Sequence, residues 1–218
     1  MEQFLAFSLE QLPYVIITLL IAFTVHEFSH AYVAYKFGDP TAKNQGRITL
    51  NPINHLDPVG TILLLIAGFG WARPVPVNRH HFKNPRLAGV AVSFAGPFSN
   101  FLLACLGFII WYGLAAAGMS GQLPDFIRQF LDMFIQLNII LFIFNLLPLP
   151  ALDGWRIIQD LAPSNIRAKM TQYEVYGVLI FLILMITPLD QYTIQPLFGV
   201  VLPFVLGGMG DFFSAIFL

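Results

Sequence analysis

Residues 25–31 of the chain read Val-His-Glu-Phe-Ser-His-Ala and follow a long apolar run. Because an α-helix completes one turn in about 3.6 residues, His26 and His30 would share one face of a helix. Two imidazoles at this spacing can bind one Zn²⁺, and Glu27 beside them can take a proton from metal-bound water. These are the chemical roles of the two histidines and the glutamate in the HExxH motif. Residues 12–24 are almost wholly apolar. The pattern therefore predicts a zinc site within a membrane-spanning helix.

The same residues also have a purely structural interpretation. In that interpretation, the two histidines only form hydrogen bonds inside a helical bundle. Ionisable side chains within membrane helices are costly, however, and they usually mark functional sites. The sequence therefore favours a metal site over a packing role.

The composition places the chain among integral membrane proteins, in contact with the lipid bilayer. Hydrophobic residues make up 57% of it and charged residues 11%, whereas a soluble domain has about 25% charged residues. The net charge of -1 shows no excess of positive charge of the kind that proteins use to bind nucleic acid. Because Cys105 is the only cysteine, the chain can form neither an intrachain disulfide nor a cysteine-based zinc cluster.

Long apolar runs predict the membrane spans, each of which needs about 20 residues. Five such runs are certain, at about residues 12–35, 87–117, 126–147, 173–188 and 196–218. A shorter run at 58–72 either re-enters the membrane, lies on it or forms a sixth span. Residues 46–50 alternate like a short strand. We expect an all-α polytopic membrane protein with five to six transmembrane helices, a re-entrant or short β element between the first two certain spans, and a single domain over residues 1–218.

Basic residues predict the orientation, since short cytoplasmic loops carry an excess of lysine and arginine. Most of the basic residues lie between the first two certain spans, and Arg156, Arg167 and Lys169 precede the fourth. Both connections should be cytoplasmic. In a cell membrane, the N-terminus would then lie outside and the C-terminus in the cytoplasm, with His26 and His30 nearer the cytoplasmic face.

A catalytic zinc usually has three protein ligands and one open position, so the two histidines need a partner. Asp153 follows a span whose backbone is broken by two prolines, and irregular backbone at membrane depth is tolerated where it lines a cavity. Its carboxylate is therefore the candidate ligand, although it could instead cap the short helix that begins near Trp155. The remaining histidines lie in polar connections and are interpreted as solvated loop residues; they are His55, His80 and His81.

Two motifs together resemble the site-2 protease family of intramembrane zinc metalloproteases. Residues 26–30 match its HExxH motif, and residues 145–154, Asn-Leu-Leu-Pro-Leu-Pro-Ala-Leu-Asp-Gly, match its NxxPxPxxDG motif. Residues 51–61 and 95–100 also look like the compact prokaryotic branch of the family, and the small residues at 95–97 permit close helix contact. The resemblance covers about residues 24–157.

The resemblance implies regulated intramembrane proteolysis, in which a transmembrane protein or peptide is cut near the cytoplasmic face. It implies one Zn²⁺ per chain, held by His26, His30 and Asp153, with Glu27 as catalytic base. Asn145 matches a position that polarises or holds substrate, although a lone asparagine in a helix can equally form a packing hydrogen bond. The chain departs from many family members in showing neither a PDZ-like insertion nor a regulatory domain.

Three further interpretations bear on function. Residues 46–50 and 73–78 could offer an edge to which an unwound substrate adds as a strand, or they could be simple loops. A metal-ion transporter would need a polar path through the later spans, which offer only Asp190 and Asp211. A non-catalytic membrane adaptor would tolerate loss of motif residues, yet all four ligand and base positions are intact. A zinc metalloprotease is therefore the favoured function.

Overall fold

The computed structural model describes residues 7–67 and 70–218, and within these ranges no residue lies in a regular β-strand. Leu56 and Ala72 form an isolated antiparallel bridge. Among the described residues, short 3₁₀ turns occur at Pro52–Asn54, Arg79–His81 and Ser120–Gln122. The α-helices are α1 (Leu12–Lys36), α2 (Thr41–Asn44), α3 (Pro58–Ala67), α4 (Pro85–Ala116), α5 (Asp125–Asn145), α6 (Asp153–Leu161), α7 (Ser164–Ile186) and α8 (Asp190–Phe217).

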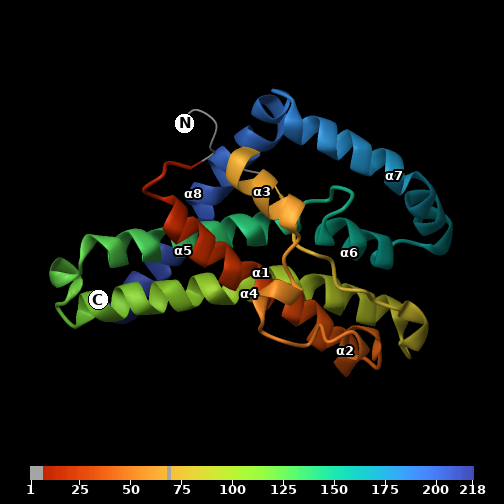
Figure 1. Ribbon diagram of the computed structural model, residues 1–218, viewed down its shortest axis with the longest axis horizontal. Coiled ribbons are helices and arrows are strands. Elements are labelled where there is room, and N and C mark those ends of the chain that lie inside the picture. Colours follow the sequence, from red (N-terminus) through yellow and green to blue (C-terminus); the bar gives the residue numbers. More distant parts are fainter. Residues whose placement is uncertain (1–6, 68–69) are drawn as a thin grey trace.

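Three long helices form the centre of the molecule. Helices α1, α4 and α5 pack against one another, α6 packs on α4, and α8 covers α4 and α5 (Figure 1). Helix α7 lies along the edge of the bundle and contacts α6 and α8. The expected all-α architecture is thereby confirmed, and the metal-binding residues predicted on α1 face the middle of the bundle.

Helix α1 ends where its sequence predicts. Gly38 takes φ +105°, a left-handed conformation that glycine adopts without penalty. Its N–H donates to the Tyr35 carbonyl, and the N–H of Asp39 donates to the Ala34 carbonyl. This pair of hydrogen bonds is a Schellman motif, which satisfies the last carbonyl groups of the helix. The chain therefore turns sharply away from the membrane span immediately after Lys36.

Four helical stretches in the described part of the chain are long and apolar enough to cross a membrane: Leu12–Lys36, Pro85–Ala116, Asp125–Asn145 and Gln191–Phe217. They match four of the five predicted spans. The predicted span at 173–188 falls in α7, which includes side chains outside the described set, and it stays a prediction. Helix α3 has 10 residues, about half of what a span requires. Its re-entrant or interfacial placement likewise stays a prediction.

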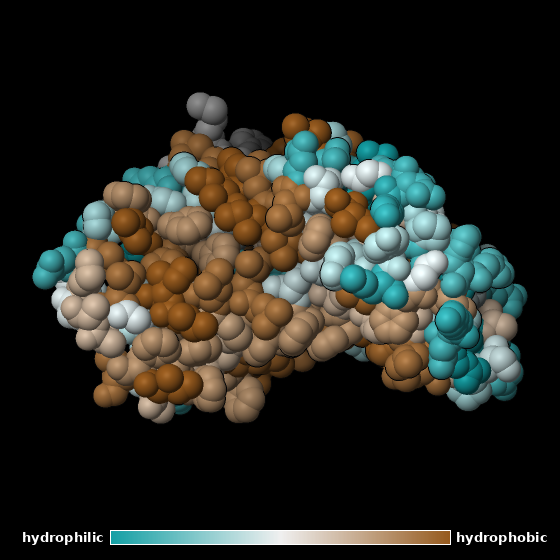
Figure 2. All heavy atoms as spheres, turned by 90° about the horizontal axis from the view of Figure 1, so that it is seen from below, coloured by the Kyte–Doolittle hydropathy of each residue, from teal (hydrophilic) through white to brown (hydrophobic). Residues whose placement is uncertain are grey.

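Hydrophilic residues gather at one end of the molecule, while apolar residues dominate the rest of the visible face (Figure 2). In Figure 1 this end carries α2, α6 and the first turns of α4 and α7, and we call it the polar end. Large apolar side chains are exposed elsewhere, among them Leu102 and Leu106 on α4 and Phe204 on α8. Such exposure is expected where a helix faces lipid rather than water. The molecule is a multi-pass membrane protein.

The predicted short strand at residues 46–50 is wrong. Gly46 turns the chain at φ +68°, and the Arg47 N–H donates to the Ala42 carbonyl to close the turn after α2. The Arg47 guanidinium then donates to the carbonyl oxygens of Arg73, at 2.6 Å, and Pro74, at 3.0 Å. A side chain thus takes the hydrogen bonds that a neighbouring strand would have made. Alternation in a five-residue window could not reveal this competition.

Residues 73–78, here called the crossing segment, run from α3 toward α4 without forming a helix, as their prolines predict. Arg47 binds the start of the segment. At its end, the Asn78 N–H donates to the buried carboxylate of Asp39 at 2.6 Å. Burial by itself would raise the pKa of Asp39, but hydrogen bonds from Thr41 and Asn78 hold that pKa below its usual value. The crossing segment is therefore fixed at both ends.

Candidate metal centre

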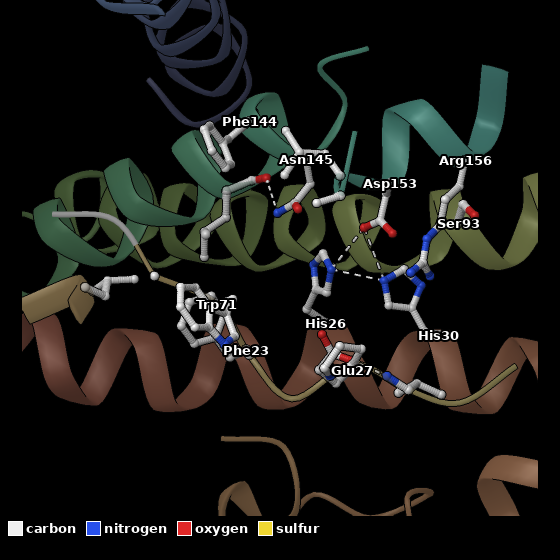
Figure 3. Close-up of a pocket in the computed structure, with 18 of the residues that line it drawn as sticks. Phe23, His26, Glu27, His30, Trp71, Ser93, Phe144, Asn145, Asp153 and Arg156 are labelled. Carbon is white, nitrogen blue, oxygen red and sulfur yellow. Dashed lines mark hydrogen bonds and ion pairs between the residues drawn. The ribbon is translucent and has the colours of Figure 1, made fainter. Parts of the chain in front are cut away.

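Three potential ligands meet in the middle of the bundle. His26 and His30 lie one turn apart on α1, and Asp153 is the first residue of α6. The two Nε2 atoms are 3.0 Å apart, and each lies 3.2 Å from Oδ2 of Asp153 (Figure 3). All three side chains are buried. In the described chain, this is the one group of three or more such side chains close enough to share an ion.

The spacing of these atoms suits a tetrahedral ion. Zinc binds nitrogen and carboxylate oxygen at about 2.0 to 2.1 Å, which places neighbouring ligand atoms about 3.3 Å apart in a tetrahedron. The observed separations of 3.0 to 3.2 Å are close to that value. The residues present therefore fit a zinc ion.

Hydrogen bonds on the far side of each imidazole orient the two histidines. Nδ1 of His30 lies 2.6 Å from the Val92 carbonyl oxygen, which can only accept, so Nδ1 carries the proton. Nδ1 of His26 lies 2.7 Å from Oδ1 of Asn100, and the Asn100 amide nitrogen donates to Oδ1 of Asn138. These partners assign the proton to Nδ1 in both rings. Both Nε2 lone pairs are thereby directed at the space beside Asp153.

Replacing Asn100 by alanine should weaken zinc binding by about 10- to 100-fold, the usual cost of losing a hydrogen-bond partner of a metal-bound histidine. The variant would leave the buried Nδ1–H of His26 without its acceptor. The matched control is Asn138→Ala, which disturbs the same buried network without touching His26. Zinc affinity measured by competition with a chelator separates the two variants, and equal affinities for both would remove Asn100 from this role.

Helix α4 passes directly over the Nε2 atoms of His26 and His30. A Cβ atom at Gly96 would lie 2.3 Å from Nε2 of His30 and 2.5 Å from Nε2 of His26. Only a residue without a side chain leaves that space free. The small residues at 95–97 thus permit the close helix contact that the sequence indicated, and the contact is with the candidate metal site itself.

Asp153 lies beside the two histidines and is not the cap residue of α6. Leu152 occupies the cap position of α6, and no side-chain cap hydrogen bond forms there. Asp153 is buried, and its Oδ2 atom lies 3.2 Å from the Nε2 atom of each histidine. The carboxylate therefore presents a negative charge to the space that the histidines also face.

Glu27 lies next to His26 on α1 and is buried. Its Oε2 accepts a hydrogen bond of 3.1 Å from the backbone N–H of Val75, in the crossing segment (Figure 3). Periodicity along α1 could not reveal this contact, since the two residues are 48 positions apart. The crossing segment therefore orients the carboxylate that the motif identifies as a base.

The site opens into a cavity of about 470 Å³, within the usual size range of ligand pockets. His26, Glu27, His30 and Asp153 line it together with mainly apolar side chains, among them Phe23, Leu64, Leu137, Phe144 and Phe181. Asn145 also lines this cavity, and its amide nitrogen donates to the Leu141 carbonyl in its own helix at 3.0 Å. The cavity thus combines one polar centre with apolar walls.

Of the other histidines, His55 differs from the sequence-based interpretation. It is fully buried, and its Nε2–H donates to the Thr49 carbonyl at 2.7 Å, so it is not a solvated loop residue. Burial lowers its pKa. Its own carbonyl accepts from the Arg73 N–H at the start of the crossing segment, which explains the burial. His80 and His81 are exposed, as predicted.

A helical bundle that surrounds two histidines and a carboxylate, with helices long enough to cross a membrane, fits a membrane-embedded metalloprotein. The chain belongs to peptidase family M50, the site-2 protease family, whose model matches residues 114–187. That match includes Asn145 and Asp153, whereas residues 26–30 lie outside it.

Curated relatives extend the comparison to the whole chain. The protein named "Putative zinc metalloprotease YwhC" from Bacillus subtilis is 57% identical over 100% of this chain and 98% of its own length. "Putative zinc metalloprotease Rip2" from Mycolicibacterium smegmatis is 31% identical over 78% of this chain and 65% of its own length. No solved structure matches the chain.

Proposed function

We propose that this protein is an intramembrane zinc metalloprotease, which hydrolyses peptide bonds of transmembrane substrates near the cytoplasmic face in regulated intramembrane proteolysis. The observation that carries the proposal is the convergence of His26, His30 and Asp153 within 3.0 to 3.2 Å. The two histidines and Glu27 beside them lie on α1, a helix long enough to span a membrane. The names of the relatives agree with zinc as the metal.

In this proposal, the three candidate ligands, Glu27 and Asn145 have distinct roles. His26, His30 and Asp153 hold one zinc ion per chain. A bound zinc would acidify its water and polarise the carbonyl of the bond to be cut. Glu27 accepts the proton of that water and later delivers it to the leaving amine, while the Val75 N–H keeps its carboxylate in place. Asn145 at the cavity wall holds the substrate.

The substrate must lie extended in the cavity, because a helix shields its own amides. The crossing segment offers it few hydrogen bonds: Pro74 and Pro76 have no N–H, and the N–H groups of Val75 and Asn78 are bound to Glu27 and Asp39. Arg47 occupies the carbonyls of Arg73 and Pro74. Strand addition would therefore be confined to the Val77 N–H and the carbonyls from Val75 to Val77.

The direct test of this proposal is the substitution Glu27→Gln. It should leave the fold and the bound zinc intact and abolish cleavage, because an amide cannot accept the proton while all three ligands remain. Zinc content and cleavage of a reporter transmembrane peptide would be measured on purified protein, with and without a chelator. Glu10→Gln, at an exposed position before α1, is the matched control and should cleave like the parent. Turnover by the Glu27 variant would exclude Glu27 as the base.

We also propose that the polar end faces the cytoplasm, which places the N-terminus outside. Cysteine labelling tests this orientation in a Cys105→Ala background. A cysteine at exposed position Lys83, in the connection before α4, should react from the cytoplasmic side. A cysteine at exposed position Gln122, between α4 and α5, should react from outside. The opposite pattern would invert the topology.

A further inference from the structure

A second cavity, of about 410 Å³, lies between the crossing segment, α4, α6 and α7. The cavity that contains the candidate metal site is here called the metal cavity. The second cavity shares five lining residues with it, namely Val75, Val77, Val92, Ser93 and Arg156. The rest of its lining is mainly polar and consists of Arg79, Gly89, Gln159, Arg167, Thr171 and Glu174. We call it the basic cavity. Because the two cavities share walls, a chain bound beside Glu27 can continue into the basic cavity along the crossing segment.

Most charges around the basic cavity are already paired. Asp160, on α6, is fully buried and forms ion pairs with Arg79 and, at 3.4 Å, with Arg167. It fits tightly against α4, since a Cβ at Gly89 would lie 2.1 Å from its Oδ2. Glu174 accepts a hydrogen bond from Gln159 at 3.3 Å. These contacts fix the walls of the cavity. Two of its three arginines, Arg79 and Arg167, are paired with Asp160.

Arg156 is the third arginine and takes part in neither of these ion pairs. It lies on α6, three positions after Asp153, and is exposed at the boundary between the two cavities. Figure 3 shows its side chain extending from α6 toward Ser93, next to His30. Among the residues that the structure describes, none forms a hydrogen bond or ion pair with its guanidinium group. Three guanidinium groups thus face two carboxylates, and Arg156, whose charge acts on Asp160 without an ion pair, stands where the two cavities meet.

We infer that Arg156 binds an acidic side chain of the substrate, a few residues from the cut bond on its polar-end side. The inference rests on the proposed function. A guanidinium group forms a planar fork that matches a carboxylate, and an extended chain advances about 3.3 Å per residue. The occupant is a peptide rather than a lipid headgroup because the crossing segment lines both cavities, and within the described residues its Val77 N–H and its carbonyls from Val75 to Val77 form no hydrogen bond. Arg156 is therefore a specificity-determining residue.

Peptide binding tests this inference without depending on turnover. Full-length protein carrying Glu27→Gln would be placed in phosphatidylcholine nanodiscs and titrated with fluorescent transmembrane peptides. The peptides differ only in the residues that flank the apolar stretch on its cytoplasmic side, which are glutamate, glutamine or lysine. The glutamate peptide should bind about tenfold more tightly than the glutamine peptide, the scale of a charge-assisted hydrogen bond. Adding Arg156→Gln should bring this ratio to about one, and adding Arg156→Glu should favour the lysine peptide.

Arg86→Gln is the matched control, since it removes one positive charge from an exposed position at the polar end outside both cavities, and it should keep the preference. Zinc content shows that each variant is folded at the metal site. Equal affinity for the glutamate and glutamine peptides, or a preference that survives Arg156→Gln, would overturn the inference. So would loss of the preference on adding phosphatidylglycerol, since the cavity would then hold a lipid headgroup. Cleavage of the glutamine peptide by the parent protein tests the protease proposal separately.

Discussion

The substitution Gly96→Ala should abolish zinc binding and cleavage while leaving the helical bundle folded. The added methyl group would lie 2.3 to 2.5 Å from the Nε2 atoms of His30 and His26, well inside the contact distance of two non-bonded atoms. It would therefore occupy the space that the metal needs or force both rings away from Asp153. Alanine is also a better helix former than glycine, so α4 itself loses nothing. Zinc stoichiometry and circular dichroism on the purified variant measure both effects.

The matched control is Gly113→Ala in the same helix. A Cβ there would lie 3.8 Å from Phe217, an ordinary van der Waals contact. Both variants make the same chemical change in α4, so any difference between them comes from the metal site. The Gly113 variant should bind zinc like the parent. If the Gly96 variant also retained one zinc per chain, α4 could not lie against the ligands as described.

The two halves of the site differ in how far the sequence alone could predict them. His26 and His30 share a face of α1 because of the helical period, so local spacing was sufficient. Asp153 could be proposed because Pro148 and Pro150 break the backbone before it. That Asp153 Oδ2 lies 3.2 Å from both histidines depends on how α6 packs on α4, which no local pattern encodes.

Residues that act through tertiary contacts were the ones that sequence reasoning missed. Asn100 holds His26 across 74 positions, and Val75 holds Glu27 across 48. Asn100 had two sequence signals: the small residues just before it, which indicated close helix contact without naming its partner, and the resemblance of residues 95–100 to the compact prokaryotic branch. His55 was misinterpreted for the same reason, since its polar neighbours in sequence indicate exposure while contacts with Thr49 and Arg73 bury it.

The substitution Asp153→Ala should lower zinc affinity by more than the 10- to 100-fold expected for Asn100→Ala, because it removes one of only three candidate ligands. Cleavage should fall with the loss of zinc. The loss would also remove the negative charge that offsets the ion within a buried site, where an uncompensated charge is costly. Zinc affinity measured on folded protein, with cleavage of the reporter peptide alongside, checks both effects.

Asp57→Ala is the control that separates a ligand from a helix cap. Asp57 accepts a hydrogen bond of 2.8 Å from the Gly60 N–H at the start of α3, so its loss should cost about 0.5 to 2 kcal/mol of stability. It lies outside the metal cavity lining, and its loss should leave zinc bound. If instead the Asp153 variant bound zinc as tightly as the Asp57 variant and still cut the peptide, Asp153 would not be a ligand. His55 could then replace it only by giving up its hydrogen bond to Thr49, so the described structure would itself need to change.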